Sequence, residues 1–239
     1  AAPVKITADD TKTASNQISL RNLAQYQTIQ SEDPSLTVAD EIKNRAEDAR
    51  GFLTHGKTAK NIVIRNAYLN LASYQRPSTV DGVVLEGVYP EQSIIRARTV
   101  SNASNTDQQI GDNHVYQYGH RVEANILKNS TLDLVALSVG QLIHNSTLTN
   151  MAARNTSGRL VNSWLQLRDH PTNTMYPAGF LLVLNSTFSG RLGGATEIIN
   201  SDLSSMICDT PIKSAQNTWF GSTDKTTLMA TGCFDESKP

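Results

Sequence analysis

The chain is poor in cysteine, in aromatic residues and in charge, and each shortage narrows its class. Its 239 residues include two cysteines, 6% aromatic residues and 18% charged residues. The 21 basic residues are balanced by 22 acidic ones, so the chain has no electrostatic footprint for nucleic acid or for a membrane surface. No stretch approaches the roughly 18 apolar residues that a membrane-spanning helix needs. We therefore expect neither a nucleic-acid partner nor a membrane span.

Sequence signatures of catalysis and of cofactor binding are also missing. The chain has no G-x-S-x-G elbow, no phosphate-binding loop and no dinucleotide fingerprint. The cysteines form no C-x-x-C pair. Two of the five histidines, His114 and His120, lie in a polar stretch at residues 101–120, without a carboxylate or cysteine at metal-ligand spacing. We therefore assign no catalytic residue, no metal and no cofactor.

Uncharged polar residues take the place of charge. There are 19 asparagines, and 38% of the residues are hydrophobic, which is too apolar for a disordered chain. From about residue 61 onward, short β-branched and aliphatic runs are closed by Gly, Asn or Ser, as in NIVIR (61–65) and GVVLE (82–86). These runs are strand signals, so the sequence predicts an all-β fold.

The cysteines and the first residues bear on the cellular compartment. The segment between Cys208 and Cys233 is polar and poor in core material, which favours a disulfide in an oxidising compartment. Two unrelated buried thiols are the alternative. The chain opens with Ala1-Ala2-Pro3, as a mature end does after signal cleavage, although an artificial start would look the same. We expect an exported protein, secreted or on a cell surface.

One short pattern recurs five times in the second half of the chain. It consists of two aliphatic residues, an optional spacer, Asn-Ser, any residue and then an apolar residue. Its asparagines are Asn129, Asn145, Asn162, Asn185 and Asn200. Successive asparagines follow one another at short and similar intervals, with one longer step between the third and the fourth. Spacing this regular predicts a repeat architecture.

Each repeat unit is predicted to form one turn of a short β-solenoid. A unit this small cannot bury its own apolar face, so neighbouring units must stack to make a core. Each repeated asparagine is expected at a corner, because asparagine tolerates the left-handed conformation and its side chain can stack on the next one as a ladder. A glycine precedes each of the last four asparagines and is expected to supply a second corner with positive φ. These glycines are Gly140, Gly158, Gly179 and Gly194.

Alternation along the strand after each corner assigns side chains to two faces. The corner serine and the apolar residue two positions later are predicted to point inward. These apolar residues are Leu132, Leu148, Leu165, Phe188 and Leu203. The residue between them is predicted to point outward, and we call this set the outward column. It consists of Thr131, Thr147, Trp164, Thr187 and Asp202. The segment 169–178 lengthens the longest step and is predicted to loop out.

These units resemble the parallel β-helix regions of bacterial secreted and surface proteins, such as autotransporter passenger domains, filamentous-haemagglutinin-like adhesins and some phage tailspikes. The resemblance covers about residues 60–205 and implies a right-handed parallel β-solenoid. We accordingly expect a polar N-terminal cap or arm at 1–56, the solenoid at 57–205 and a C-terminal cap at 206–239. The charged run Asp40–Arg50 predicts one short helix in the first of these. Caps are expected because open solenoid ends expose unpaired strand edges.

The outward column is the candidate binding site. Its functional interpretation is a flat ligand-binding face on which Trp164 stacks against a sugar ring. The alternative is an ordinary solvated sheet face, on which threonine is simply a good strand former.

The sequence favours an exported binding protein, adhesin-like or fibre-associated, that presents the solenoid face to a glycan or a surface protein. Stacked repeats without a converging catalytic set motivate this choice. A self-assembling subunit of a pilus, fibre or phage appendage is one alternative. A β-helix polysaccharide hydrolase or lyase is another. Glycoside hydrolysis needs carboxylates about 5–9.5 Å apart, whereas Asp133 and Asp202 are predicted four coils, roughly 19 Å, apart.

Overall fold

The computed structural model describes residues 4–7, 29–30, 58–65, 68–70, 79–86, 93–106, 120–153, 155–168 and 178–235. Two compact units are present, residues 1–125 (unit 1) and residues 126–239 (unit 2). Nearly all the described elements are strands, and nearly all of these pair in parallel as the turns of a β-solenoid. The predicted all-β solenoid fold is therefore confirmed.

Unit 1 is built on a ladder of parallel strands. The strands are β1 (Val4–Thr7), β2 (Ile29–Gln30), β3 (Thr58–Arg65), β4 (Tyr68–Asn70), β5 (Thr79–Glu86), β6 (Ser93–Asn105) and the start of β7 (His120–Lys128). β1, β3, β5 and β6 pair in that order, and β4 pairs with β6. β2 runs antiparallel against β3.

A column of residues with positive φ crosses β3, β5 and β6. Asn61, Gly82 and Asn102 have φ angles of 51°, 85° and 53°, and their neighbours on both sides are paired in register. A Cβ at Gly82 would lie 2.7 Å from Asn61 Oδ1, so the glycine makes room for the asparagine side chain. Asn102 Nδ2 donates a hydrogen bond to Asp81 Oδ1 at 2.6 Å. Asparagine and glycine are the residues that enter this conformation most readily.

His120 is buried at the start of β7, and the predicted polar stretch at 101–120 is in part strand, since β6 continues to Asn105. His120 Nδ1 accepts a hydrogen bond from the Ser93 backbone N–H at 3.3 Å. Its buried Nε2 has no hydrogen-bond partner within the described residues. Burial lowers the pKa of His120 from 6.5 to about 4, because it disfavours the charged imidazolium.

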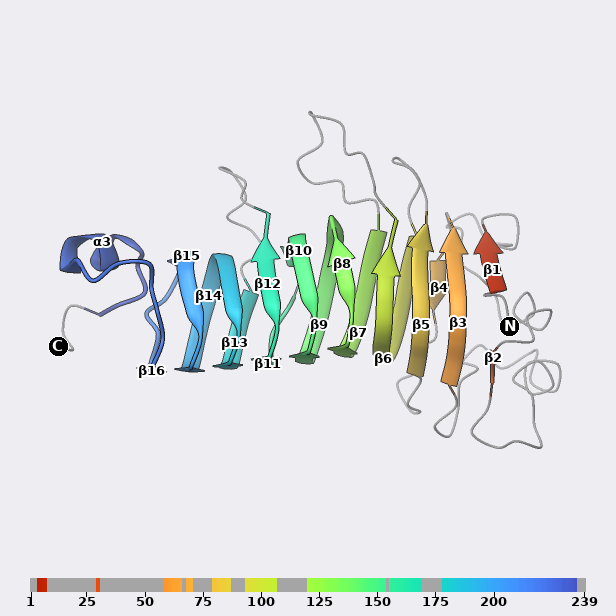
Figure 1. The fold of residues 1–239 in the computed structure, drawn as a ribbon, viewed down its shortest axis with the longest axis horizontal. Helices are drawn as coiled ribbons and strands as arrows, with labels where there is room; N and C mark the ends of the chain where they lie inside the picture. Colours follow the sequence, from red (N-terminus) through yellow and green to blue (C-terminus); the bar gives the residue numbers. More distant parts are fainter. Residues whose placement is uncertain are drawn as a thin grey trace, which may run out of the picture. The chain divides into compact units, whose positions relative to one another are not determined.

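Most strands of unit 2 belong to two parallel ladders (Figure 1), which are joined at Asn-Ser corners and by one further parallel pairing. The strands before the corners are the end of β7, β9 (Val135–His144), β11 (Arg159–Val161), β13 (Ala178–Leu184), the end of β14 (Thr187–Ile199) and β16 (Ser214–Gln216). The strands after the corners are β8 (Thr131–Asp133), β10 (Thr147–Ala153), β12 (Trp164–Leu167), the start of β14 and β15 (Asp202–Cys208). The apolar residues predicted to point inward after the first five corners are at most 1% exposed.

Each corner asparagine of unit 2 is in the left-handed conformation. The φ angles of the five repeat asparagines lie between 48° and 52°. A sixth corner follows at Asn217, with φ 45°, where Thr218 takes the place of serine. We number the coils by these asparagines, from the first (Asn129) to the sixth (Asn217). Side-chain amides bond from Asn185 Nδ2 to Asn162 Oδ1 at 3.2 Å and from Asn217 Nδ2 to Asn200 Oδ1 at 2.8 Å.

The corner serines form a continuous hydrogen-bonded ladder. From Ser130 to Ser186, each backbone N–H donates to the serine Oγ of the next coil at 3.1–3.2 Å. Each Oγ donates in turn to the carbonyl oxygen two residues earlier at 2.8–2.9 Å. Ser201 N–H donates to Thr218 Oγ1 at 3.4 Å. The ladder thereby satisfies backbone N–H groups that burial would otherwise leave unpaired.

The expectation that all four glycines before the corners have positive φ was wrong for three of them. Only Gly158 has a positive φ, of 89°. Gly140, Gly179 and Gly194 lie inside strands, where extended backbone needs no glycine. A Cβ at Gly194 would lie 2.6 Å from Thr210 Oγ1, so close packing of neighbouring coils accounts for this glycine.

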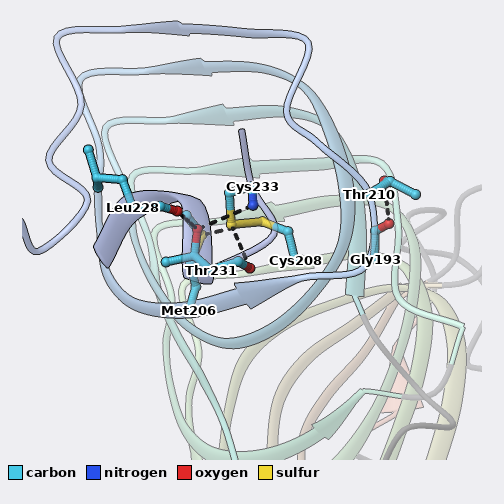
Figure 2. The surroundings of a disulfide bond; sticks show 7 residues. All are labelled: Gly193, Met206, Cys208, Thr210, Leu228, Thr231 and Cys233. Carbon is cyan, nitrogen blue, oxygen red and sulfur yellow. Dashed lines mark hydrogen bonds between the residues drawn. A yellow bond between two sulfur atoms is a disulfide. The ribbon is translucent and has the colours of Figure 1, made fainter. Parts of the chain in front are cut away.

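Cys208 and Cys233 form the predicted disulfide near the C-terminus (Figure 2). Backbone hydrogen bonds flank it, from Cys208 N to Thr231 O at 2.8 Å and from Ile212 N to Cys233 O at 2.9 Å. The disulfide encloses α3 (Lys225–Ala230), whose N-cap Asp224 accepts a hydrogen bond from Thr227 N at 2.8 Å. A disulfide in a β-solenoid is compatible with an exported protein.

Several predictions concern residues outside the described ranges. They include the short helix at Asp40–Arg50, most of the N-terminal region at 1–56 and residues 169–177 of the segment predicted to loop out. The handedness of the solenoid stays a prediction. In the described part of the chain, no helix is long and apolar enough to cross a membrane.

We expect acid to destabilise the fold through His120. The folded chain, with a His120 pKa of about 4, does not take up the proton that the unfolded chain binds with a pKa near 6.5. This penalty is absent above about pH 6.5 and grows to about 3 kcal/mol as the pH falls to 4. Urea unfolding of the wild type and of His120→Gln between pH 7 and 4 measures it. An equal loss of stability in both proteins would contradict the prediction.

Removing one hydroxyl from the serine ladder should also destabilise the fold. Ser163→Ala leaves the buried Ser146 N–H without its acceptor and removes one of the two donors to Val161 O, which keeps its bond from the Asn145 N–H. We expect a loss of about 1–3 kcal/mol in the free energy of unfolding. Ser205→Ala, at an exposed position of β15, is the matched control and should change stability by less than about 0.5 kcal/mol. Equal effects of the two substitutions in urea unfolding would argue against the ladder.

Candidate ligand-binding face

The outward column lies in a single line on the strands that follow the corners. The strand registers pair each of its members with the next, from Thr131 to Asp202. Trp219 extends the column to the sixth coil through a parallel bridge to Asp202. From Thr147 to Trp219, each backbone N–H in the column donates to the corner carbonyl of the preceding coil at 2.9 Å. The backbone therefore sets the spacing, at about 4.8 Å per coil.

Two large aromatic side chains stand exposed on this column. Trp164 is 45% exposed and Trp219 is 49% exposed. They are the only two tryptophans in the chain. Thr187 and the partly exposed Asp202 occupy the column between them, and Thr131 and Thr147 continue it through the first two coils. The column is therefore a line of polar residues with two indole rings, separated by three coil spacings, or roughly 14 Å.

An open groove of about 750 Å³ runs beside the column over the last three coils. Corner asparagines and the two residues that follow each of them line it. The lining residues are Asn185, Ser186, Thr187, Asn200, Ser201, Asp202, Asn217, Thr218 and Trp219. Asp202 is the only charged residue of this lining. Its Oδ1 accepts a hydrogen bond from the Ser204 backbone N–H at 2.9 Å, which orients the carboxylate.

The structure does not bring Asp133 and Asp202 together. Asp133 belongs to the first coil, where Oδ1 accepts hydrogen bonds from Thr149 Oγ1 at 2.6 Å and from Asn150 Nδ2 at 2.9 Å. Asp202 belongs to the fifth coil, so four coil spacings, roughly 19 Å, lie between the two positions. This pair of carboxylates therefore lacks the separation that glycoside hydrolysis requires. Within the described ranges, no group of three or more His, Cys, Asp or Glu side chains is placed to hold a metal ion.

Sequence reasoning missed the sixth coil and its tryptophan. Asn217 follows Asn200 at a step within the range of the earlier ones. Threonine replaces the repeat serine at 218, and a search for Asn-Ser pairs passes over it. A pattern that accepts either hydroxyl residue after asparagine would have found this unit and placed Trp219 in the outward column.

Comparisons of the chain with protein-family models, with curated proteins and with solved structures found no match. Function is therefore inferred from the residues and geometry of this face itself.

Proposed function

We propose that the chain is an exported binding protein whose outward column, with the groove beside it, binds a glycan. The observation that carries this proposal is the presence of both tryptophans, half exposed, on one column. Aromatic rings beside a few converging polar groups are the usual lining of a ligand site. A solvated sheet face accounts for the threonines but not for two aligned indole rings.

The way the face is built supports this role. The ladder of corner hydrogen bonds lies directly behind the column and fixes its backbone, so a ligand would meet a surface that is already arranged. A preorganised face loses little conformational entropy when it binds. An adhesin-like role, on a cell surface or in a secreted assembly, is part of the proposal, since the disulfide and the solenoid are compatible with export.

Intrinsic fluorescence tests the proposal directly, because both tryptophans of the chain belong to the column. We expect a glycan selected on an array to change the tryptophan emission on titration. Trp164→Ala and Trp219→Ala should each weaken binding about tenfold, which is the loss of roughly 1.4 kcal/mol of ring contact. Calorimetry supplies the affinity of the double variant, which has no tryptophan.

The matched control is Leu181→Ala, which removes an apolar side chain that is 63% exposed on β13, outside the column. Its affinity should equal that of the wild type. The proposal fails if no glycan binds, or if the double tryptophan variant binds as well as the wild type.

Self-assembly is a second candidate, favoured by the unpaired edge of the sixth coil. Among the described residues, the backbone N–H groups of Asn217 and Thr218 have no partner, whereas those of the earlier corners bond to the next coil. An extended segment of a second copy would find a template there. The edge strand β16 is only three residues long, however, and Pro211 and Lys213 precede it, features that limit edge-to-edge pairing.

Light scattering coupled to gel filtration separates the two candidates. We expect a monomer whose mass does not change with concentration, both in the full chain and in a variant without residues 1–25. Oligomers that grow with concentration and disappear on truncation would instead assign the chain to assembly.

A further inference from the structure

The groove beside the fourth to sixth coils has a chemical character that narrows the ligand class. Its lining consists of parallel rows, which include the corner asparagines and the outward-column residues of these coils. Each row repeats at one strand spacing, about 4.8 Å. A ligand whose own chemical groups repeat along its length can therefore make the same contacts at successive coils. A linear polymer lying along the rows meets this condition.

The asparagine row leaves two hydrogen-bonding groups open in the middle of the groove. Amide–amide bonds join Asn162 to Asn185 and Asn200 to Asn217. Within the described residues, no such bond joins Asn185 to Asn200, so Asn185 Oδ1 and Asn200 Nδ2 have no side-chain partner. Both side chains are exposed and line the groove. They present one acceptor and one donor, which suits the hydroxyl groups of a sugar.

Charge excludes one large class of polymer from this groove. The lining contains Asp202 and no lysine, arginine or histidine. An acidic polysaccharide would place its carboxylates or sulfates beside Asp202 without a compensating cation, and like charges in contact disfavour binding. A neutral sugar has no such penalty and can donate a hydroxyl proton to Asp202 Oδ2.

We propose that this groove, together with Trp164 on the neighbouring third coil, binds a neutral, extended glycan chain that runs along the column. Trp164 and Trp219 stack on two sugar rings near the ends of the bound segment, while Asn185, Asn200 and Asp202 bond to the hydroxyls between them. An extended β-linked chain advances by close to one strand spacing per sugar, so the two stacked rings are about three sugars apart. This inference rests on the proposed glycan-binding function and adds the ligand's charge, shape and length.

The length of the ligand provides the first test. Neutral β-linked oligosaccharides of glucose and of N-acetylglucosamine, from two to six sugars long, are titrated by calorimetry. We expect affinity to rise about tenfold between three and four sugars in a series that binds, because only the longer chain reaches both rings. Trp219→Ala should remove this rise, so that oligomers of four to six sugars bind the variant no more tightly than the trisaccharide does. Leu181→Ala, which lies outside the column, should keep the rise.

The charge of the ligand provides the second test. Oligogalacturonates of the same lengths should bind the wild type at least tenfold more weakly than the neutral series. Asp202→Asn keeps the side-chain shape and removes the charge, so it should narrow this gap. The quantity to compare is the absolute affinity for oligogalacturonates, which should rise in this variant, whereas neutral oligomers lose the hydroxyl bond to the carboxylate and should bind more weakly. Circular dichroism of each variant verifies that the coil stack is intact.

The failures of the two proposals are distinguishable. This inference is overturned if acidic oligomers bind more tightly than neutral ones, or if affinity does not rise between three and four sugars. The proposed glycan-binding function would still hold in either case, provided that binding depends on the column. Column-dependent binding of a protein, with no glycan bound, overturns both.

Discussion

The hydrogen bond from each corner serine's backbone N–H to the serine hydroxyl of the next coil is the interaction on which unit 2 depends. At a corner the strand ends, and the regular N–H to carbonyl pairing of the sheet is interrupted. A hydroxyl is small enough to be buried there, and it accepts one hydrogen bond while donating another. Asparagine, one position earlier, supplies the left-handed turn that directs this hydroxyl inward. The backbone conformation thus requires the asparagine, and the hydrogen bonds require the serine that follows it.

Once the corners are fixed, alternation along the next strand decides where every side chain lies. The apolar residue two positions beyond the serine enters the core, where Phe188 meets the edge of Phe180 with ring centroids 6.0 Å apart. The residue that lies between the serine and this apolar residue must therefore face outward. The column that we propose as the ligand-binding face is thus a direct geometric consequence of the ladder, which aligns its members.

The corners of unit 2 could be predicted because each of the first five requires the same two residue types, so the pair Asn-Ser recurs in the sequence. The column of positive-φ residues in unit 1 was not predicted, because Asn61, Gly82 and Asn102 share a conformation and not a residue type. The glycines before the repeat asparagines misled for the opposite reason. Glycine occurs there for several causes, of which positive φ applies to Gly158 alone among the four.

The burial of His120 was not foreseeable, since a polar local sequence carries no sign of the packing around it. Trp164 was found through the register of the repeat, and Trp219 was lost with the substitution of threonine for serine.

The corner asparagines are unevenly separated along the chain, yet adjacent coils meet at the same hydrogen-bond distances. The number of residues that pass around a coil is therefore independent of the rise between coils. Residues added between two corners leave the rise between coils unchanged. A chain built in this way can gain or lose segments between corners, and one residue of the column can be exchanged for another. In both cases the remaining column positions keep their spacing. The side chains of the outward column can therefore vary without changing the corner residues on which the fold depends.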